Sequence, residues 1–258
     1  TGAEYVYTVA ESALEGFTPV YPTGTLNIEN QQNLIGLTVT KHWTDNGANA
    51  DATFGSRTVT VQLVRKLQGE ADTAFTAVPD AARTFAGSTT YTDLPAGVVD
   101  ASGAYHPYVY SVTETAVDGF TTQIAYSGAG TGGDQTATVT NARVRVPYTA
   151  TKQWKTYAGA ALTPIPAGAS VQLQLTRTVE GATTDVSGRL ITLDGTADTT
   201  AGSATDGETA AWTAMFKGLE TYTTDRKAIT YGVRELPGAS TVGFLTTVTT
   251  DANGATVV

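Results

Sequence analysis

The sequence repeats itself along its length, and this constrains the fold more than any other feature. Lys41 and Lys152 each lie in a Thr-Lys-x-Trp motif, and they are 111 residues apart. Asn30 and Asn141 each end a short run of alternating residues, and they are also 111 residues apart. Because two independent motifs share one period, the chain is predicted to hold tandem copies of one domain.

A third motif, Tyr-x-Val-x-Glu, ends at Glu11, Glu114 and Glu235, and each copy is followed by Gly-Phe. Within one copy of the domain the order is therefore lysine, glutamate, asparagine. This order predicts three segments: the C-terminal tail of a preceding repeat (1–33), a complete domain (34–144), and a domain lacking its last strand residues (145–258). Pro147 is expected in a short stiff linker at the start of the third segment.

The composition favours strands over helices. The chain has 50 threonines and 27 glycines, and threonine is a β-former while glycine marks turns. Residues 57–65 and 169–177 alternate apolar and polar side chains with a period of two, as half-buried strands do. About seven short strands in some 110 residues predict an all-β fold of tandem β-sandwich domains.

Several functional classes are excluded by residue counts. The chain has no cysteine and two histidines, so it cannot form disulfides, thiolate metal sites or a His-rich metal centre. A net charge of −9 disfavours nucleic acid as a partner, and no apolar run is long enough to span a membrane. We expect no cofactor. Asp45, Asn49 and Asp51 could form a calcium loop, but a plain polar loop is the favoured alternative.

Side-chain parity places one polar residue of each motif on an apolar strand face. Alternate residues of a strand share a face, so Lys41 is expected inside with its neighbours Val39 and Trp43. By the same rule Glu114 faces inward with Tyr110 and Val112, and Asn141 with Ala137 and Val139. Because isolated charges are costly in an apolar interior, the three polar residues are predicted to meet there.

A lysine, a glutamate and an asparagine that meet in a dry interior can react. Burial disfavours the charged forms of lysine and glutamate, and a neutral amine can attack a carboxamide. The glutamate would serve as general acid and base, and the products would be ammonia and a Lys–Asn isopeptide bond. Two alternatives remain open: a buried ion pair with an asparagine as hydrogen-bond partner, or exposure of the three residues at the rim of the sandwich.

The ordered motifs resemble Cna B-type repeats, the immunoglobulin-like domains of Gram-positive surface adhesins and pilins. The resemblance covers nearly the whole chain and implies a spontaneous isopeptide bond between Lys41 and Asn141, with Glu114 as its catalyst. It also implies that Lys152 and Glu235 require an asparagine beyond Val258. Glu11 and Asn30 would likewise require a lysine upstream of the sequence.

The resemblance implies a stalk or shaft segment of a cell-surface adhesin or pilus, extracellular and attached to the cell wall through a region outside this sequence. No turnover of an external substrate is expected. The expected partners are neighbouring repeats of the same polypeptide and other subunits of a surface fibre. The alternative is a ligand-binding adhesin module that grips a host protein or glycan of unknown identity, for instance through the loop 195–209.

Overall fold

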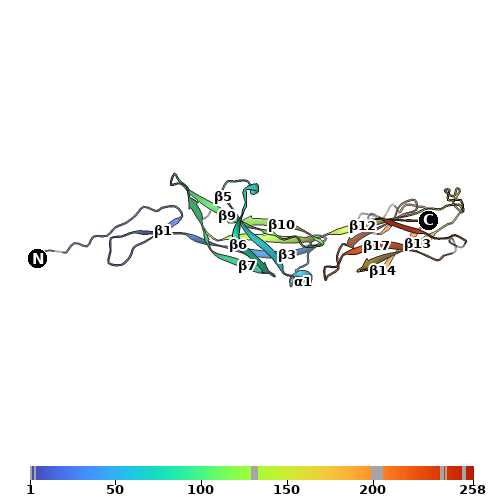
Figure 1. The fold of residues 1–258 in the computed structure, drawn as a ribbon, viewed down its shortest axis with the longest axis horizontal. Coiled ribbons are helices and arrows are strands. Elements are labelled where there is room, and N and C mark those ends of the chain that lie inside the picture. The colour runs from blue at the N-terminus through green and yellow to red at the C-terminus, as the bar shows by residue number, and fades with distance from the viewer. Residues whose placement is uncertain are drawn as a thin grey trace. The chain divides into compact units, whose positions relative to one another are not determined.

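A computed structural model describes residues 2, 4–128, 133–198, 206–238, 241, 243–251 and 254–258. The chain forms two compact units, Thr1–Arg143 (unit 1) and Val144–Val258 (unit 2). Strands make up nearly all of the regular structure in both units (Figure 1). The predicted all-β fold is therefore confirmed, while residues 1–33 are grouped with the first complete domain.

Unit 1 contains two main sheets, a small hairpin and two single-turn helices. The first sheet has the order β10-β11-β3-β4, with β7 paired to β3, and the second has the order β6-β5-β9-β8. Their bounds are β3 (Leu34–Asp45), β4 (Ala48–Asn49), β5 (Val59–Leu67), β6 (Thr76–Phe85), β7 (Ser88–Pro95), β8 (Gly97–Val99), β9 (Tyr105–Glu114), β10 (Phe120–Ser127) and β11 (Gln135–Arg143). The helices are α1 (Asp51–Phe54) and the 3-10 helix η1 (Asp72–Ala74).

Unit 2 repeats this plan with a five-stranded sheet, β15-β16-β12-β19-β18, and a three-stranded sheet, β14-β13-β17. Their bounds are β12 (Arg145–Lys152), β13 (Val171–Val179), β14 (Ala182–Leu193), β15 (Gly207–Ala210), β16 (Thr213–Glu220), β17 (Ile229–Leu236), β18 (Val248–Asp251) and β19 (Gly254–Val257). In both units the first long strand pairs in parallel with the last one, β3 with β11 and β12 with β19.

The core of each unit lies between its two sheets. In β3 every second residue from Ile35 to Trp43 is buried, and Lys41 is among them. The predicted strands at 57–65 and 169–177 are β5 and β13, shifted by two residues. In each unit one continuous cluster of buried apolar residues fills the interior. The inward parity assigned to Lys41 is thus confirmed.

The N-terminal segment forms a hairpin with the same pairing as the last hairpin of unit 1. In β1 (Phe17–Val20) and β2 (Glu29–Gln32), Phe17 lies opposite Gln32. In β10 and β11, Phe120 lies opposite Arg143. In both hairpins the asparagine is two residues before the partner of the phenylalanine. The repeat identified from the motifs therefore extends to strand register.

A tight turn and a proline are two local features of the strands. The turn at Asn46 and Gly47 closes the β3–β4 hairpin, and both residues have positive φ, of 50° and 77°, as a type I′ turn requires. The linker assigned to Pro147 is wrong, because Pro147 lies inside β12 where the pairing register shifts. Proline has no N–H to donate, so a strand tolerates it where its ladder is irregular.

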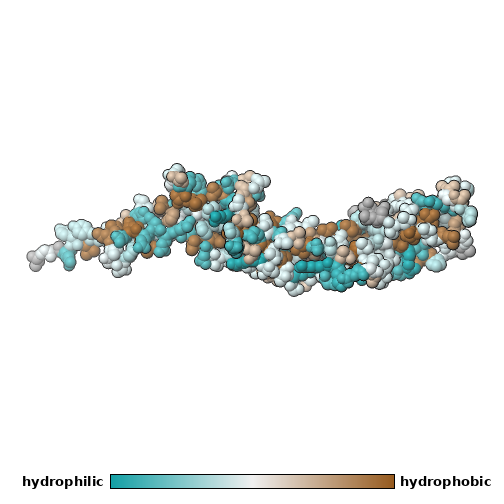
Figure 2. All heavy atoms as spheres, viewed as in Figure 1, coloured by the Kyte–Doolittle hydropathy of each residue, from teal (hydrophilic) through white to brown (hydrophobic). Residues whose placement is uncertain are grey.

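The surface mixes polar and apolar residues, as expected for a chain in which only 15% of the residues are charged. In the view of Figure 2, hydrophobic residues form separate patches among hydrophilic and near-neutral ones. No helix in the described part of the chain is both long and apolar enough to cross a lipid bilayer.

Candidate functional site

The predicted lysine of unit 1 lies in the middle of the parallel pair β3–β11. Lys41 is opposite Val139, and Trp43 is opposite Asn141. The ammonium group of Lys41 donates hydrogen bonds to the carbonyl oxygens of His42 and Val139, at 3.1 Å and 3.3 Å. It also lies 4.3 Å from the ring centroid of Trp43, a distance at which a cation is attracted to an aromatic face.

Glu114 reaches the same point from β9, in the opposite sheet. Its Oε1 atom lies 3.6 Å from Lys41 Nζ, and both side chains are shielded from solvent. Burial lowers the pKa of Lys41 from its usual 10.5 to about 8, although the negative charge of Glu114 opposes this shift. The neutral amine is therefore far more accessible here than for a lysine in water.

Asn141 is fully buried on β11 and joins the cluster through a residue that the motif analysis did not identify. The hydroxyl oxygen of Thr122, on β10, lies 2.9 Å from Asn141 Oδ1 and 2.6 Å from Glu114 Oε2. Thr122 is directly opposite Asn141 in the hairpin register. Lys41 thus contacts Glu114 directly, and Glu114 is linked to Asn141 through Thr122.

Unpaired polar atoms are concentrated at this cluster. Among the described residues of unit 1, three buried side-chain atoms have no hydrogen-bond partner: Trp43 Nε1, Glu114 Oε1 and Asn141 Nδ2. Leaving a buried polar group unpaired costs about 1–3 kcal/mol, and a catalytic role is one explanation for a group that stays unpaired. The alternative that these residues are exposed at the rim is excluded by their burial.

Unit 2 repeats the lysine and the glutamate. Lys152 Nζ lies 3.0 Å from Glu235 Oε2, and both side chains are almost fully buried. Lys152 is opposite Val257, as Lys41 is opposite Val139, and Val258 is hydrogen-bonded to Thr247. A residue following Val258 would therefore correspond to Asn141 and lie opposite Thr246. A cleft of about 540 Å³ is lined by Lys152, Trp154, Phe244 and Val258, among others.

The two predicted residues of the N-terminal segment also meet. Asn30 Nδ2 donates a hydrogen bond of 3.0 Å to Glu11 Oε1. Both residues are exposed, in contrast to Glu114 and Asn141. Glutamate and asparagine thus lie close together in both places where the described chain contains both motif residues, in direct contact here and through Thr122 in unit 1.

In the calcium loop considered for residues 45–51, the carboxylate of Asp51 already interacts with other groups of the protein. Asp51 accepts hydrogen bonds from the backbone N–H of Trp43 and the amide of Asn49, and lies 2.9 Å from His42 Nδ1. The contact with His42 is the main cause that lowers the pKa of Asp51. In the described ranges no three or more His, Cys, Asp or Glu side chains form a group that could hold a metal ion.

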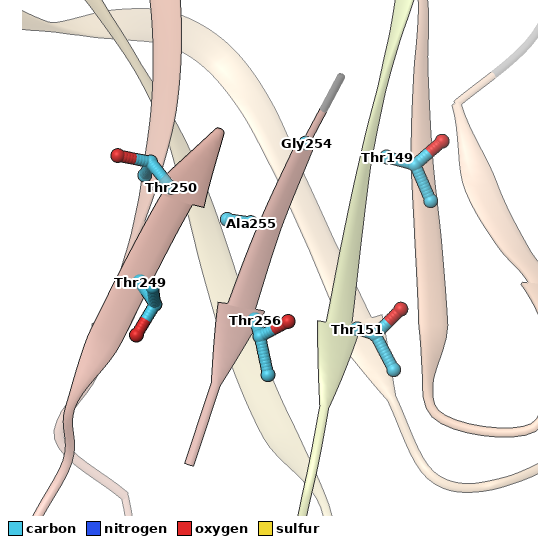
Figure 3. Close-up of a pocket in the computed structure, with 7 residues that line it drawn as sticks. All are labelled: Thr149, Thr151, Thr249, Thr250, Gly254, Ala255 and Thr256. Atoms are coloured by element: carbon cyan, nitrogen blue, oxygen red, sulfur yellow. The ribbon is translucent and has the colours of Figure 1, made fainter. Parts of the chain in front are cut away.

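The loop 195–209 lies partly outside the described residues. On its described part, Glu208 accepts hydrogen bonds from the backbone N–H groups of Asp194, Gly195 and Trp212, and Gly207–Ala210 form β15 rather than loop. A separate shallow groove of about 250 Å³ lies over β12, β18 and β19. Figure 3 shows that threonines from these strands line it, with no acidic or basic side chain among the labelled residues.

Comparisons with known proteins agree with the motif order. The family model described as "Cna protein B-type domain" matches residues 37–142 and again 148–258. No curated protein matches the chain.

Among solved structures, a single B repeat unit of the collagen binding surface protein Cna of Staphylococcus aureus is 21% identical. It covers 86% of this chain and 96% of its own, with a TM-score of 0.30. The pilus adhesin SpaC from Lactobacillus rhamnosus GG is 18% identical and covers 94% of this chain but 31% of its own, with a TM-score of 0.32. A major pilin protein from Streptococcus pyogenes is 11% identical and covers 87% and 95%, with a TM-score of 0.34.

The two family matches fall one in each compact unit and together span most of the sequence. Each contains the Lys–Glu pair placed between two sheets, and the first also contains the asparagine. The chain therefore belongs to the Cna protein B-type domain family and carries two copies of that domain.

Proposed function

We propose that this chain is a structural stalk segment of a bacterial cell-surface protein, and that unit 1 is stiffened by an isopeptide bond between Lys41 and Asn141. The observation that carries this proposal is the cluster in which Lys41 contacts Glu114 and Glu114 is linked to Asn141 through Thr122. The reaction occurs once in each molecule and converts no external substrate.

The buried cluster is better suited to reaction than to a permanent ion pair. An ion pair alone leaves Asn141 Nδ2 and Glu114 Oε1 without hydrogen-bond partners in the interior. Attack of Lys41 Nζ on the carboxamide expels the unpaired amide nitrogen as ammonia. The new bond also replaces a buried ammonium by a neutral amide whose N–H can be donated to Glu114 Oε1. Both changes remove costs of burying polar groups.

The position of the bond explains why it suits a stalk. Unit 1 begins its sandwich with β3 and ends it with β11, and these two strands are parallel neighbours. A pull on the two ends of the sandwich shears one strand against the other. With Lys41 bonded to Asn141, the load passes from β3 to β11 through the covalent bridge. Residues 42–140 then carry no tension, so they cannot be unravelled.

The mass of the intact, denatured chain tests the bond. The polypeptide of residues 1–258 should weigh less than its sequence by one ammonia, because within these residues Lys41, Glu114 and Asn141 form the one set that contains all three groups. The Lys41→Ala and Glu114→Ala variants should each show their full sequence mass. A suitable control is Lys66→Ala, since Lys66 is a second buried lysine of unit 1 and forms an ion pair with Asp72. This variant should still lose one ammonia.

Full sequence mass in folded wild-type protein would overturn the proposed bond. Membership of the family would stand in that case, because the family matches span residues 37–142 and 148–258 and do not depend on the bond.

A cell-surface location, association with neighbouring repeats and incorporation into a surface fibre belong to the same proposal. A ligand-binding adhesin module is the alternative considered for the loop 195–209. Binding measurements against matrix proteins and glycans separate the two functions. Saturable binding that is lost when residues 196–206 are replaced by a short glycine-serine linker would contradict a purely structural role.

A further inference from the structure

The side chain of Thr122 lies between the two groups whose proton exchange the proposed reaction needs. Its hydroxyl oxygen is 2.6 Å from Glu114 Oε2 and 2.9 Å from Asn141 Oδ1. Both distances are within the normal range for O–H···O hydrogen bonds. Glu114 Oε1, the other oxygen of the same carboxyl group, faces Lys41 Nζ. One carboxyl group therefore faces the nucleophile on one side and, through Thr122, the electrophile on the other.

Proton counting shows what this arrangement requires. A threonine hydroxyl has a single hydrogen, while an amide oxygen and an ionised carboxylate are both acceptors only. Thr122 can donate to Asn141 Oδ1 and keep its short contact with Glu114 only if Glu114 Oε2 carries a proton and donates it to Thr122. The two contacts are thus simultaneously satisfied in the state in which Lys41 is a neutral amine and Glu114 is a neutral acid.

We propose that Thr122 is a proton relay for isopeptide formation, passing a proton between Glu114 and the carboxamide oxygen of Asn141. This inference rests on the proposed Lys41–Asn141 bond and names a residue outside the Lys-Glu-Asn set. Thr122 acts by touching a reacting atom, Asn141 Oδ1, and polarises the carbonyl group before attack.

The steps balance without any further reactant. Lys41 first gives one proton to Glu114, and in the neutral state this proton lies on Oε2. As the lone pair of Nζ attacks Cγ of Asn141 and the C=O double bond opens, Oδ1 takes the hydroxyl proton of Thr122, Thr122 takes the proton of Glu114 Oε2, and Oε1 takes one proton from Nζ. When the tetrahedral intermediate collapses, Oε1 gives this proton to Nδ2, which leaves as ammonia. The two transfers through Thr122 reverse at the same time, so Glu114 again carries one proton on Oε2.

The environment of Asn141 supports this direction of transfer. Its oxygen is hydrogen-bonded to Thr122, while its nitrogen has no partner among the described residues. A hydrogen bond to the oxygen stabilises the charge that develops there during attack, and an unbonded nitrogen is free to leave. The lowered pKa of Lys41, caused mainly by burial, increases the fraction of nucleophilic amine.

The strand register identifies the residue that corresponds to Thr122 in unit 2 and in the N-terminal hairpin. Thr122 lies two residues after Phe120, on the strand opposite Asn141. In unit 2 the residue two positions after Phe244 is Thr246, which lies next to Thr247, the hydrogen-bonded partner of Val258. In the N-terminal hairpin the residue opposite Asn30 is Pro19. Both complete or nearly complete domains therefore have a hydroxyl at this position, and the N-terminal hairpin does not.

The test is a time course of bond formation in the full chain. Protein is made by cell-free translation, aliquots are quenched in acidic denaturant, and the loss of one ammonia is followed by mass spectrometry. Thr122→Val keeps the shape of the side chain but removes the hydroxyl, and Thr122→Ser keeps the hydroxyl but removes the methyl group. Thr121→Val is the control, because Thr121 is the adjacent residue of the same strand, is exposed as Thr122 is, and its hydroxyl donates to the carbonyl oxygen of Ala142 instead of contacting Glu114 or Asn141.

A relay predicts that Thr122→Val slows bond formation by about a hundredfold, the usual size of a general acid–base contribution. Thr122→Ser should stay within a few fold of wild type, and Thr121→Val should be unchanged. A role in strand packing predicts the opposite order, because valine is a better strand residue than serine. Resistance of unit 1 to proteolysis shows whether Thr122→Val folds. If it does not fold, Thr122→Ala is used in its place.

The relay is overturned if the valine variant reacts at the wild-type rate, or if valine and serine variants are slowed equally. In either case wild-type protein still loses one ammonia, so the proposed bond survives. If wild-type protein never loses ammonia, the bond itself is wrong and the relay fails with it.

Discussion

The contribution of the bond to the stability of unit 1 can be isolated by removing its reacting pair without leaving a buried charge. Removing Lys41 alone would leave Glu114 unpaired in the interior, and breaking a buried pair in this way costs about 3–5 kcal/mol by itself. We therefore choose the double variant Lys41→Met and Glu114→Gln, in which both side chains keep their approximate shape and neither is charged.

The expected size of the effect follows from the residues that the bond joins. A bridge from Lys41 to Asn141 closes a loop of about 100 residues, and the loop-entropy relation for disulfides gives about 4–5 kcal/mol for such a loop. In a domain of this size, 1 kcal/mol corresponds to about 4 °C in Tm. The double variant should therefore lower the Tm of unit 1 by roughly 20 °C.

Calorimetry on the full chain measures this change, and unit 2 serves as an internal reference. The control is the same double substitution in an Asn141→Ala background, in which no bond can form. There we expect a change of only a few degrees, because only local packing and the ion pair are altered. The difference between the two backgrounds is the contribution of the bond. Equal changes in the Tm of unit 1 in both backgrounds would show that no bond stabilises the wild-type domain.

Three further predictions follow from the site geometry. The Asn141→Ala variant keeps Lys41 unbonded, and burial lowers the pKa of Lys41 in the folded protein to about 8, below its unfolded value of about 10.4. The unfolded state therefore binds more protons in this interval, so denaturant titrations should show stability rising from about pH 8 to pH 10.5; a flat profile would contradict the assigned pKa. An asparagine appended after Val258 should make unit 2 lose a second ammonia, whereas an appended alanine should not. The same mass loss in both variants would show that the residue after Val258 does not take the position of Asn141. In single-molecule stretching, bonded unit 1 should unfold without a step in length, while the Lys41→Met, Glu114→Gln variant should lengthen by a step on the order of 300 Å. A step in wild-type protein would show that the force does not pass through the bond between Lys41 and Asn141.

The fold and most of the site could be predicted because both produce periodic patterns in the sequence. Lys41 is in phase with Val39 and Trp43, and all three are buried. A strand with one buried face has a fixed side-chain parity, so a polar residue on the apolar phase must find a partner inside. The pairing of Lys41 with Glu114 and of Lys152 with Glu235 follows from this argument.

The role of Thr122 could not be predicted in the same way. Threonine is the most abundant polar residue of the chain, so one more threonine on a strand carries no signal. Its importance depends on the pairing of β10 with β11, which places it opposite Asn141. The Gly-Phe motif gave a usable clue, because Thr122 and Thr246 each lie two residues after its phenylalanine.

Pro147 and the residues of the candidate calcium loop show the limits of local patterns. Proline between two domains usually indicates a linker, but β12 accommodates Pro147 at a register shift. The spacing of Asp45, Asn49 and Asp51 is compatible with a cation loop. The structure instead uses Asp51 to bind the backbone of Trp43, an interaction that no sequence spacing reveals.

Identification of the joined peptides is the most direct test of the bond between Lys41 and Asn141. Wild-type protein is denatured and digested, and the fragments are sequenced by tandem mass spectrometry. We expect one branched peptide in which the side chain of Lys41 is bonded to the side chain of Asn141, with one ammonia lost. Recovery of the peptides around Lys41 and Asn141 as separate, unmodified fragments from folded protein would contradict it.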